Sequence, residues 1–209
     1  MAPQAGIDLE PNGPREKLVD VAVRNTRMEN NSGAGILVYL KNLSRESDPV
    51  SIRFENCYVK GGKDTGIALG ALKDDGPQGT VEFVNCTIED TQKCGAYVYD
   101  KSPGAAAARF VNCKWKNVAA SDPRNPLRVP ILIHSFLKRN SAKLGGVEFT
   151  GCYVYDEQDR PALVLRCPDE ADIVSGLKGT ICVRNPHGAR ALLPKQIHAP
   201  ELSLIEVRE

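Results

Sequence analysis

The sequence Val-Glu-Phe-Val-Asn-Cys-Thr-Ile at residues 81–88 decides the fold, because the same pattern recurs along the chain. Closely similar copies, which keep the Phe and the Cys with Asn or Gly between them, occupy residues 52–59, 108–115 and 147–154, and weaker copies occupy 21–28 and 181–186. The Asn or Gly positions 25, 56, 85, 112, 151 and 185 lie 31, 29, 27, 39 and 34 residues apart. A spacing of about 30 residues predicts a repeat architecture.

Each repeat reads as two short strands joined by a bend. Ile52 and Phe54 fall on one face of an extended chain and Arg53 on the other, which is the two-residue period of a β-strand. The alternation breaks at Asn56, a residue type that tolerates the left-handed backbone conformation. Gly151 would serve the same bend because it has no side chain to clash. The unit therefore predicts a strand, a one-residue bend and a second strand.

A second family of strands lies between these repeats and begins with Gly in most copies. The second residues of these strands, at positions 7, 36, 67, 96, 131 and 162, lie 29, 31, 29, 35 and 31 residues apart, in phase with the first family. Three short strands per coil and about seven coils predict an all-β fold, a right-handed parallel β-helix solenoid that forms one domain over residues 1–209.

This pattern resembles the pectate-lyase-like β-helix superfamily over essentially the whole chain. The most specific marks of the resemblance are the Asn of the bend and the inward Phe and Cys that stack from coil to coil. The stacking predicts a buried ladder of phenylalanines, Phe54, Phe83, Phe110 and Phe149, beside a buried column of thiols, Cys57, Cys86, Cys113 and Cys152. Parallel side chains suit the dihedral of a disulfide poorly, so we expect no disulfide framework. Cys94, Cys167 and Cys182 have no metal-ligand spacing, so we expect no zinc site.

Charge and hydropathy exclude several classes of partner. Twenty-seven Lys and Arg against 26 Asp and Glu give a net charge of +1, so no general attraction to nucleic acid or an anionic membrane is expected. The chain has no apolar run near 18 residues, so no transmembrane helix is expected, and its first residues are not expected to form a signal peptide. We expect it to be the C-terminal part of a longer β-helix whose upstream coils complete it. An extracellular or periplasmic location is implied by the resemblance alone.

The outer face of the Gly-led strands is the predicted binding surface, because stacking aligns residues about thirty apart. The first outward column is expected to be Asp8, Leu37, Ala68, Tyr97, Leu132 and Leu163, and the second Glu10, Tyr39, Gly70, Tyr99, His134 and Leu165. Charged residues just past the strand ends are Lys41, Asp100, Lys101 and Arg166. The resemblance implies that this face is the floor of a polysaccharide groove, and tyrosine rings suit sugars. The expected substrate-binding residues are Tyr39, Lys41, Tyr97, Asp100, Lys101 and Arg166.

Asp8 and Glu10 are the first candidate catalytic residues. Two residues apart on one strand, they point the same way with Cα atoms roughly 6.5–7 Å apart. That spacing is compatible with retaining or inverting glycoside hydrolysis. The alternative is that both are surface acids of a first coil. A divalent cation such as calcium would relieve their repulsion, but no spacing of oxygen ligands identifies a metal site, and no cofactor is expected.

Tyr99 and His134 are the second candidate catalytic residues. They fall in one column on adjacent coils, where either could act as the base that takes the proton α to a uronate carboxylate. Lys101 or Arg166 would then neutralise the negative charge that develops. No specific lyase motif supports this interpretation, and a single surface His often has no catalytic role.

Two hypotheses of function follow. In the first, the protein is a carbohydrate-active enzyme, a glycoside hydrolase or a polysaccharide lyase. In the second, it is a non-catalytic β-helix that binds glycans or serves as a scaffold. The sequence leaves open whether the protein is catalytic, which sugar it binds and which linkage it would cleave.

Overall fold

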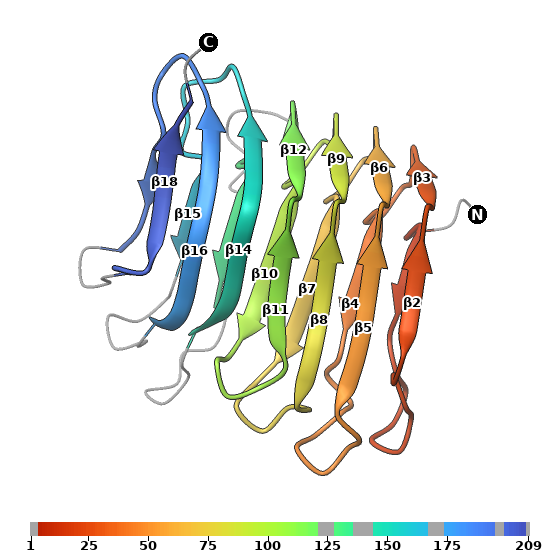
Figure 1. The fold of residues 1–209 in the computed structure, drawn as a ribbon. Coiled ribbons are helices and arrows are strands. Elements are labelled where there is room, and N and C mark those ends of the chain that lie inside the picture. The colour runs from red at the N-terminus through yellow and green to blue at the C-terminus, as the bar shows by residue number, and fades with distance from the viewer. Residues whose placement is uncertain (1–3, 121–127, 136–143, 167–173, 195–198, 208–209) are drawn as a thin grey trace.

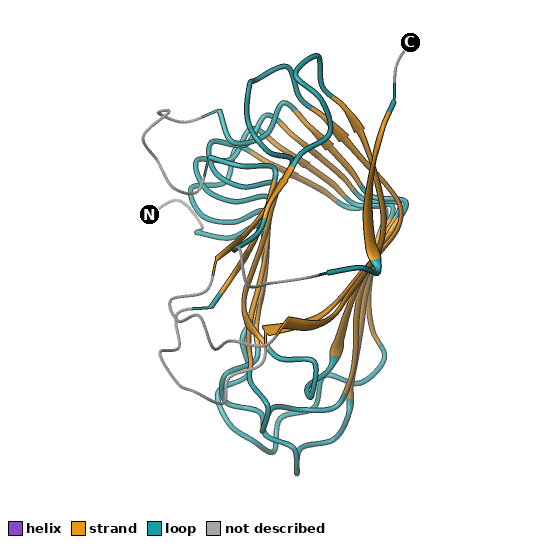
Figure 2. Ribbon diagram, turned by 90° about the vertical axis from the view of Figure 1, so that its left-hand side faces the viewer, coloured by secondary structure: helices purple, strands orange, loops and turns teal. Residues whose placement is uncertain are grey.

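The computed structural model describes residues 4–120, 128–135, 144–166, 174–194 and 199–207. These residues form a parallel β-solenoid of about six turns, close to the seven predicted, and contain no helix (Figure 1). Viewed along the stack, successive coils lie nearly on top of one another around a common interior (Figure 2). The predicted fold class is confirmed.

The strands divide into two parallel sheets. Sheet A contains the Gly-led strands in the order β1 (Ile7–Leu9), β4 (Ile36–Tyr39), β7 (Ile67–Leu72), β10 (Ala96–Lys101), β13 (Ile131–His134), β15 (Leu163–Arg166) and β17 (Ala191–Leu192). Sheet B contains β2 (Val21–Arg24), β5 (Val50–Glu55), β8 (Gly79–Val84), β11 (Ala107–Val111), β14 (Leu144–Tyr155), β16 (Val174–Arg184) and β18 (Leu202–Glu206). Past the bend, sheet B continues in β3 (Arg27–Glu29), β6 (Tyr58–Lys60), β9 (Thr87–Glu89) and β12 (Lys114–Lys116).

The bend within sheet B is made by a column of left-handed residues, as predicted. Asn25, Asn56, Asn85 and Asn112 have φ of 53°, 54°, 52° and 52°, and Gly151 has φ of 60°. Each Asn from Asn56 to Asn112 donates its side-chain N–H to the Asn Oδ1 of the preceding coil at 3.2 Å. A Cβ at Gly151 would collide with Asn112 Oδ1, so a side chain there would require the Asn112 amide to shift.

The interior contains the predicted phenylalanine ladder and thiol column. Rings of the four phenylalanines Phe54, Phe83, Phe110 and Phe149 stack with centroids 5.2, 5.0 and 5.4 Å apart. Cys57, Cys86, Cys113 and Cys152 are buried free thiols. The Cys113 thiol lies 3.2 Å from the carbonyl oxygen of Phe83, so each coil also contacts the one before it through sulfur. Cys167 lies outside the described residues.

A second column of left-handed residues follows the short strands and was not predicted. Asn30, Gly61, Asp90 and Asn117 have φ of 55°, 68°, 56° and 48° and end β3, β6, β9 and β12. Their spacings of 31, 29 and 27 residues repeat those of the first column. This shared spacing was the signal that could have identified them.

The weak copy at residues 181–186 was wrongly aligned. In β14 and β16 the two strands of sheet B merge into continuous strands of 12 and 11 residues. Phe149 pairs with Gly179, so the phenylalanine ladder ends there. Asn185 follows the end of β16, has no positive φ, and donates its side-chain N–H to the Gln158 carbonyl at 2.8 Å. It closes a later turn and does not make the bend.

The outer face of sheet B carries opposite charges on successive coils. Register pairing places Arg53, Glu82, Arg109, Glu148 and Lys178 in one column. The neighbouring side chains form ion pairs of 3.0, 3.2, 3.4 and 3.7 Å along this column. The charges of this column are therefore paired within the protein.

Candidate functional site

The outer face of sheet A brings most of the predicted site residues together. Its first column is Asp8, Leu37, Ala68, Tyr97, Leu132 and Val164, and its second contains Tyr39, Gly70, Tyr99, His134 and Arg166. The predicted places of Leu163 and Leu165 were wrong by one residue. Leu163 pairs with Ile131, and both leucines are buried in the core. This shift places Arg166 directly beside His134.

Aromatic rings form a continuous row across this face. The rings of Tyr39 and Tyr99 are stacked with centroids 6.2 Å apart, and those of Tyr99 and Tyr97 lie 5.0 Å apart. Tyr97 continues the row to His134, with ring centroids 6.3 Å apart and the Tyr97 hydroxyl 3.2 Å from His134 Nδ1. The row spans strands β4 to β13 and presents half-buried rings with polar tips.

Gly70 makes the stacking of Tyr39 and Tyr99 possible. These tyrosines lie two coils apart and Gly70 pairs with both of them. The Tyr99 ring lies over Gly70, where any Cβ would collide with it. A glycine inside a strand often marks such a close approach.

Burial shifts the pKa values of the titratable groups in the aromatic row. It raises the pKa of Tyr99 to about 12 and also raises the pKa of Tyr97. Burial, assisted by the nearby positive charge of Arg166, lowers the pKa of His134, and Asp100 opposes this effect. At neutral pH the two phenols are therefore protonated and the imidazole is neutral.

Lys101 does not lie on this face, and the outward position expected for it is wrong. Asp100 has φ of 46°, so the strand bends there and its alternation changes phase. Lys101 consequently pairs with the inward Leu72 and is 0% exposed, donating its amine N–H to the Ser102 carbonyl. The same left-handed bend occurs at Ala71 in the preceding coil.

The acidic pair lies at the other end of the face. Asp8 and Glu10 are exposed, as is Lys41 past the end of β4. Register pairing places Asp8 in the first outward column, and the negative charges of Glu10 and Asp8 contribute to the raised pKa of Tyr99. Acidic residues thus lie at the β1 end of the face and Arg166 at the β15 end.

A small apolar cluster on the outer side of sheet A was not predicted from the sequence. The outward Leu132 and Val164 are 0% and 1% exposed and pack with Cys94 and Val129, and Tyr97 contacts them. The sequence did contain a signal for this cluster, because residues at the outward positions of a solvated strand are seldom large and apolar on two neighbouring strands. This cluster supports the Tyr97 end of the aromatic row.

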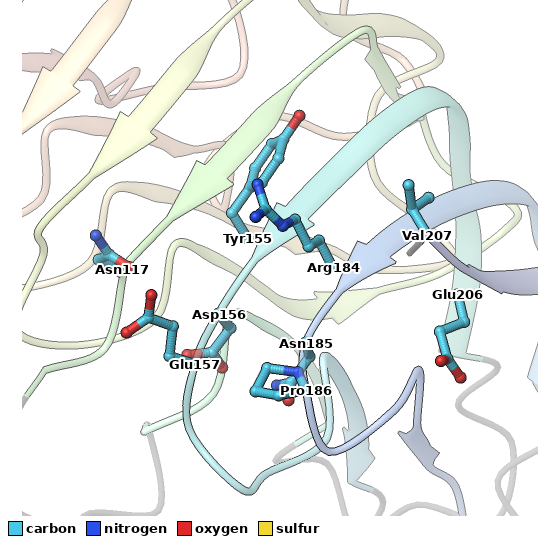
Figure 3. A pocket seen from close by; sticks show the side chains of 9 residues that line it. All are labelled: Asn117, Tyr155, Asp156, Glu157, Arg184, Asn185, Pro186, Glu206 and Val207. Carbon is cyan, nitrogen blue, oxygen red and sulfur yellow. The ribbon is translucent and has the colours of Figure 1, made fainter. Parts of the chain in front are cut away.

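A cavity of about 730 Å³ lies elsewhere in the molecule and contains none of the predicted site residues. It is formed where β14, β16 and β18 end (Figure 3). Among the described residues, no group of three or more His, Cys, Asp or Glu side chains is placed to hold a metal ion. The described part of the chain also has no helix long and apolar enough to cross a membrane.

Comparison with known proteins supports the fold. Residues 15–115 match a family model described as a right handed beta helix region. Searches of curated proteins and of solved structures gave no match. The matched segment contains the clearest repeats, the asparagine column and most of the aromatic row, and the same stacking continues through the described coils beyond it. The chain is a right-handed parallel β-helix protein.

Proposed function

We propose that the protein binds a polysaccharide along the outer face of sheet A. The observation that carries this proposal is the row formed by Tyr39, Tyr99, Tyr97 and His134. Flat rings with polar tips offer apolar contact to the C–H faces of sugars and hydrogen bonds to their hydroxyl groups. A row that crosses several coils suits an extended chain better than a single small molecule.

The groups around the row support the same ligand class. Glu10 and Asp8 near the β1 end, Asp100 on β10 and Arg166 on β15 supply hydrogen-bond acceptors and donors for hydroxyl groups. The protonated Tyr97 and Tyr99 can each donate and accept. On sheet B, in contrast, a ligand would have to compete with the ion pairs of the charged column.

Binding is tested by affinity electrophoresis of the intact chain through gels that contain neutral or uronic-acid polysaccharides. Tyr99→Ala removes the central ring of the row and should weaken binding about fivefold or more, since one aromatic contact contributes on the order of 1 kcal/mol or more. Tyr58→Ala is the matched control, because Tyr58 is a half-buried tyrosine on the outer face of sheet B. Equal retardation of both variants and the parent chain would contradict the proposal.

Cleavage by proton abstraction is a second candidate function, favoured by the surroundings of His134. The imidazole is neutral at neutral pH, contacts the Tyr97 hydroxyl and lies beside Arg166. In such a reaction the imidazole Nε2 takes the proton α to a uronate carboxylate, the C–H electrons form a carbon–carbon double bond, and the glycosidic oxygen leaves and is protonated. Arg166 would stabilise the charge on the carboxylate. A Tyr99 phenol with a pKa of about 12 is better suited to donate a proton than to take one.

An activity screen separates cleavage from binding alone. Reducing ends and the ultraviolet absorbance of an unsaturated uronate product are followed together for the parent chain, the His134→Gln variant and the Asp8→Asn/Glu10→Gln double variant. Absorbance that is lost only in His134→Gln would support elimination. Reducing ends without absorbance, lost only in the double variant, would support hydrolysis by the acidic pair. No product with retained binding would leave a glycan-binding module.

A further inference from the structure

The cavity at the ends of β14, β16 and β18 is formed by the last three coils of sheet B. Register pairing places Tyr155 beside Arg184, and the Val207 backbone N–H donates to the Val183 carbonyl at 2.9 Å. Side chains from these strand ends and from the turns after them line the space: Asn117, Tyr155, Asp156, Glu157, Arg184, Asn185, Pro186, Glu206 and Val207 (Figure 3). Its volume of about 730 Å³ lies within the range of small-ligand sites.

The cavity opens where the left-handed turn of the earlier coils stops. Asn117 is the last residue of that column, and its N–H donates to the Tyr155 carbonyl at 3.1 Å. The next two positions, Asp156 and Asn185, do not have positive φ. The chain there no longer repeats the left-handed turn of the earlier coils, and the cavity lies among the turns that replace it.

One wall of the cavity is held rigidly by a buried ion pair. Arg160 Nε lies 2.6 Å from Asp156 Oδ2, and both side chains are almost fully buried. The Arg160 guanidinium also donates to the carbonyls of Val118 at 2.6 Å and Ala119 at 2.9 Å. These bonds fix the turn after β14 against the turn after β12. A wall fixed in this way lowers the entropy lost when a ligand binds.

The residues that line the cavity present apolar surface together with charged groups of both signs. Tyr155, whose ring stacks on Tyr153 with centroids 6.0 Å apart, is fixed in the wall and presents a ring and a hydroxyl. Glu157 and Glu206 supply negative charge, and Arg184 supplies positive charge. Lys116, with its Nζ 5.9 Å from the Tyr155 ring centroid, adds a second positive charge near the cavity.

We propose that this cavity binds a short neutral oligosaccharide, at a site separate from sheet A. The Asp156–Arg160 ion pair is neutral as a unit, and the acids Glu157 and Glu206 are balanced by Arg184 and Lys116, which leaves no net charge to select an ion. Carboxylate, amide, guanidinium and phenol groups together offer both acceptors and donors, as the hydroxyl groups of a sugar require. Val207 and Pro186 supply apolar contacts for C–H groups. The proposal does not depend on the polysaccharide site, because it rests on different residues.

The test is a titration of the ¹⁵N-labelled full chain with four neutral trisaccharides, maltotriose, cellotriose, mannotriose and galactotriose, and with trigalacturonate as the anionic comparison. We expect at least one neutral sugar to shift the backbone amides of Asn117, Asn185 and Val207 in a saturable way. Tyr155→Ala and Glu157→Gln should each weaken this binding about tenfold. Glu157 is an exposed turn residue, so its variant tests the site without threatening the fold.

Tyr99→Ala separates the two sites. It should leave the cavity shifts unchanged, whatever it does to polysaccharide binding on sheet A. The proposal is overturned if no neutral sugar shifts the cavity amides, if only trigalacturonate does so, or if Glu157→Gln and Tyr155→Ala both bind as tightly as the parent chain. Shifts confined to the amides of Tyr97 and His134 would support the sheet A site and overturn this one.

Discussion

The outer faces of sheet A and sheet B are built on the same core but use their side chains differently. On sheet B, the column from Arg53 to Lys178 alternates in charge, and each member pairs with its neighbours. On sheet A, the corresponding positions hold a row of rings and, at Gly70, no side chain at all.

This difference shows how a solenoid separates stability from function. Inward residues recur on successive coils because the core must match in register. Outward residues are free to vary from coil to coil. A ligand on the outer face of sheet B would have to compete with the ion pairs, whereas the aromatic row of sheet A presents half-buried rings.

A substitution in the core that both sheets share should have the largest effect on the free energy of unfolding. Phe83 stacks between Phe54 and Phe110 and is fully buried, so Phe83→Ala should lower the free energy of unfolding by about 3–5 kcal/mol. Urea denaturation measures the change, and Thr87→Ala on the outer face is the control, with an expected loss under about 1 kcal/mol. A near-neutral Phe83→Ala would mean that inside and outside have been assigned in reverse.

The repeat predicted the inside of the molecule well. Phe83, Cys86 and Asn85 recur at fixed spacing because each must meet its own kind on the next coil, and such a requirement leaves a strong pattern in the sequence. The outside was predicted less well. Arg166 was placed one residue out of register, since the strand that contains it has no Gly to mark its start.

Bends other than the asparagine column were also missed. Asp100 changes the phase of β10, and alternation alone therefore placed Lys101 on the wrong side. The cavity at the ends of β14, β16 and β18 depends on turns that stop repeating, so no periodic signal could reveal it. In a solenoid, repetition identifies the scaffold, and departures from repetition create the features that are hardest to predict.

Lys101 belongs to a strand of sheet A, but its side chain lies in the core rather than on the outer face. Burial lowers its pKa from 10.5 to about 8, and Asp74 offsets part of the effect. Between about pH 8 and 10.5 the unfolded chain therefore holds a proton that the folded chain lacks, so this group makes the protein more stable as pH rises. The difference between the two pKa values corresponds to about 3 kcal/mol of destabilisation at pH 7.

Lys101→Met should therefore raise the free energy of unfolding at pH 7 by up to about 3 kcal/mol, with a gain that shrinks between pH 8 and 10.5. Urea denaturation at several pH values measures it, and Lys73→Met, at an exposed position of the same turn region, is the control. A variant that is less stable than the parent chain at every pH would show that the ammonium is well stabilised in the core.

Substitutions at the bend of sheet B should have a smaller effect on the free energy of unfolding. Asn85 has φ of 52°, donates to Asn56 and accepts from Asn112. Asn85→Ala should cost about 1–2 kcal/mol, because alanine is strained in the left-handed region. Asn85→Gly should cost less, since glycine already occupies this bend at position 151. Thermal denaturation of both variants measures the difference, and equal losses would place the effect in the hydrogen bonds rather than in the backbone.

The charged column of sheet B gives the smallest effect and tests the comparison most directly. Glu82 pairs with Arg53 at 3.0 Å and Arg109 at 3.2 Å, and all three side chains remain partly exposed. Glu82→Gln should therefore lower the free energy of unfolding by less than about 1 kcal/mol, and the difference should shrink further in high salt. Retardation by polysaccharide should be unchanged, because no residue of the aromatic row contacts this column. A variant that keeps its stability and loses retardation would show that sheet B, rather than sheet A, meets the ligand, and would reverse the roles assigned to the two faces.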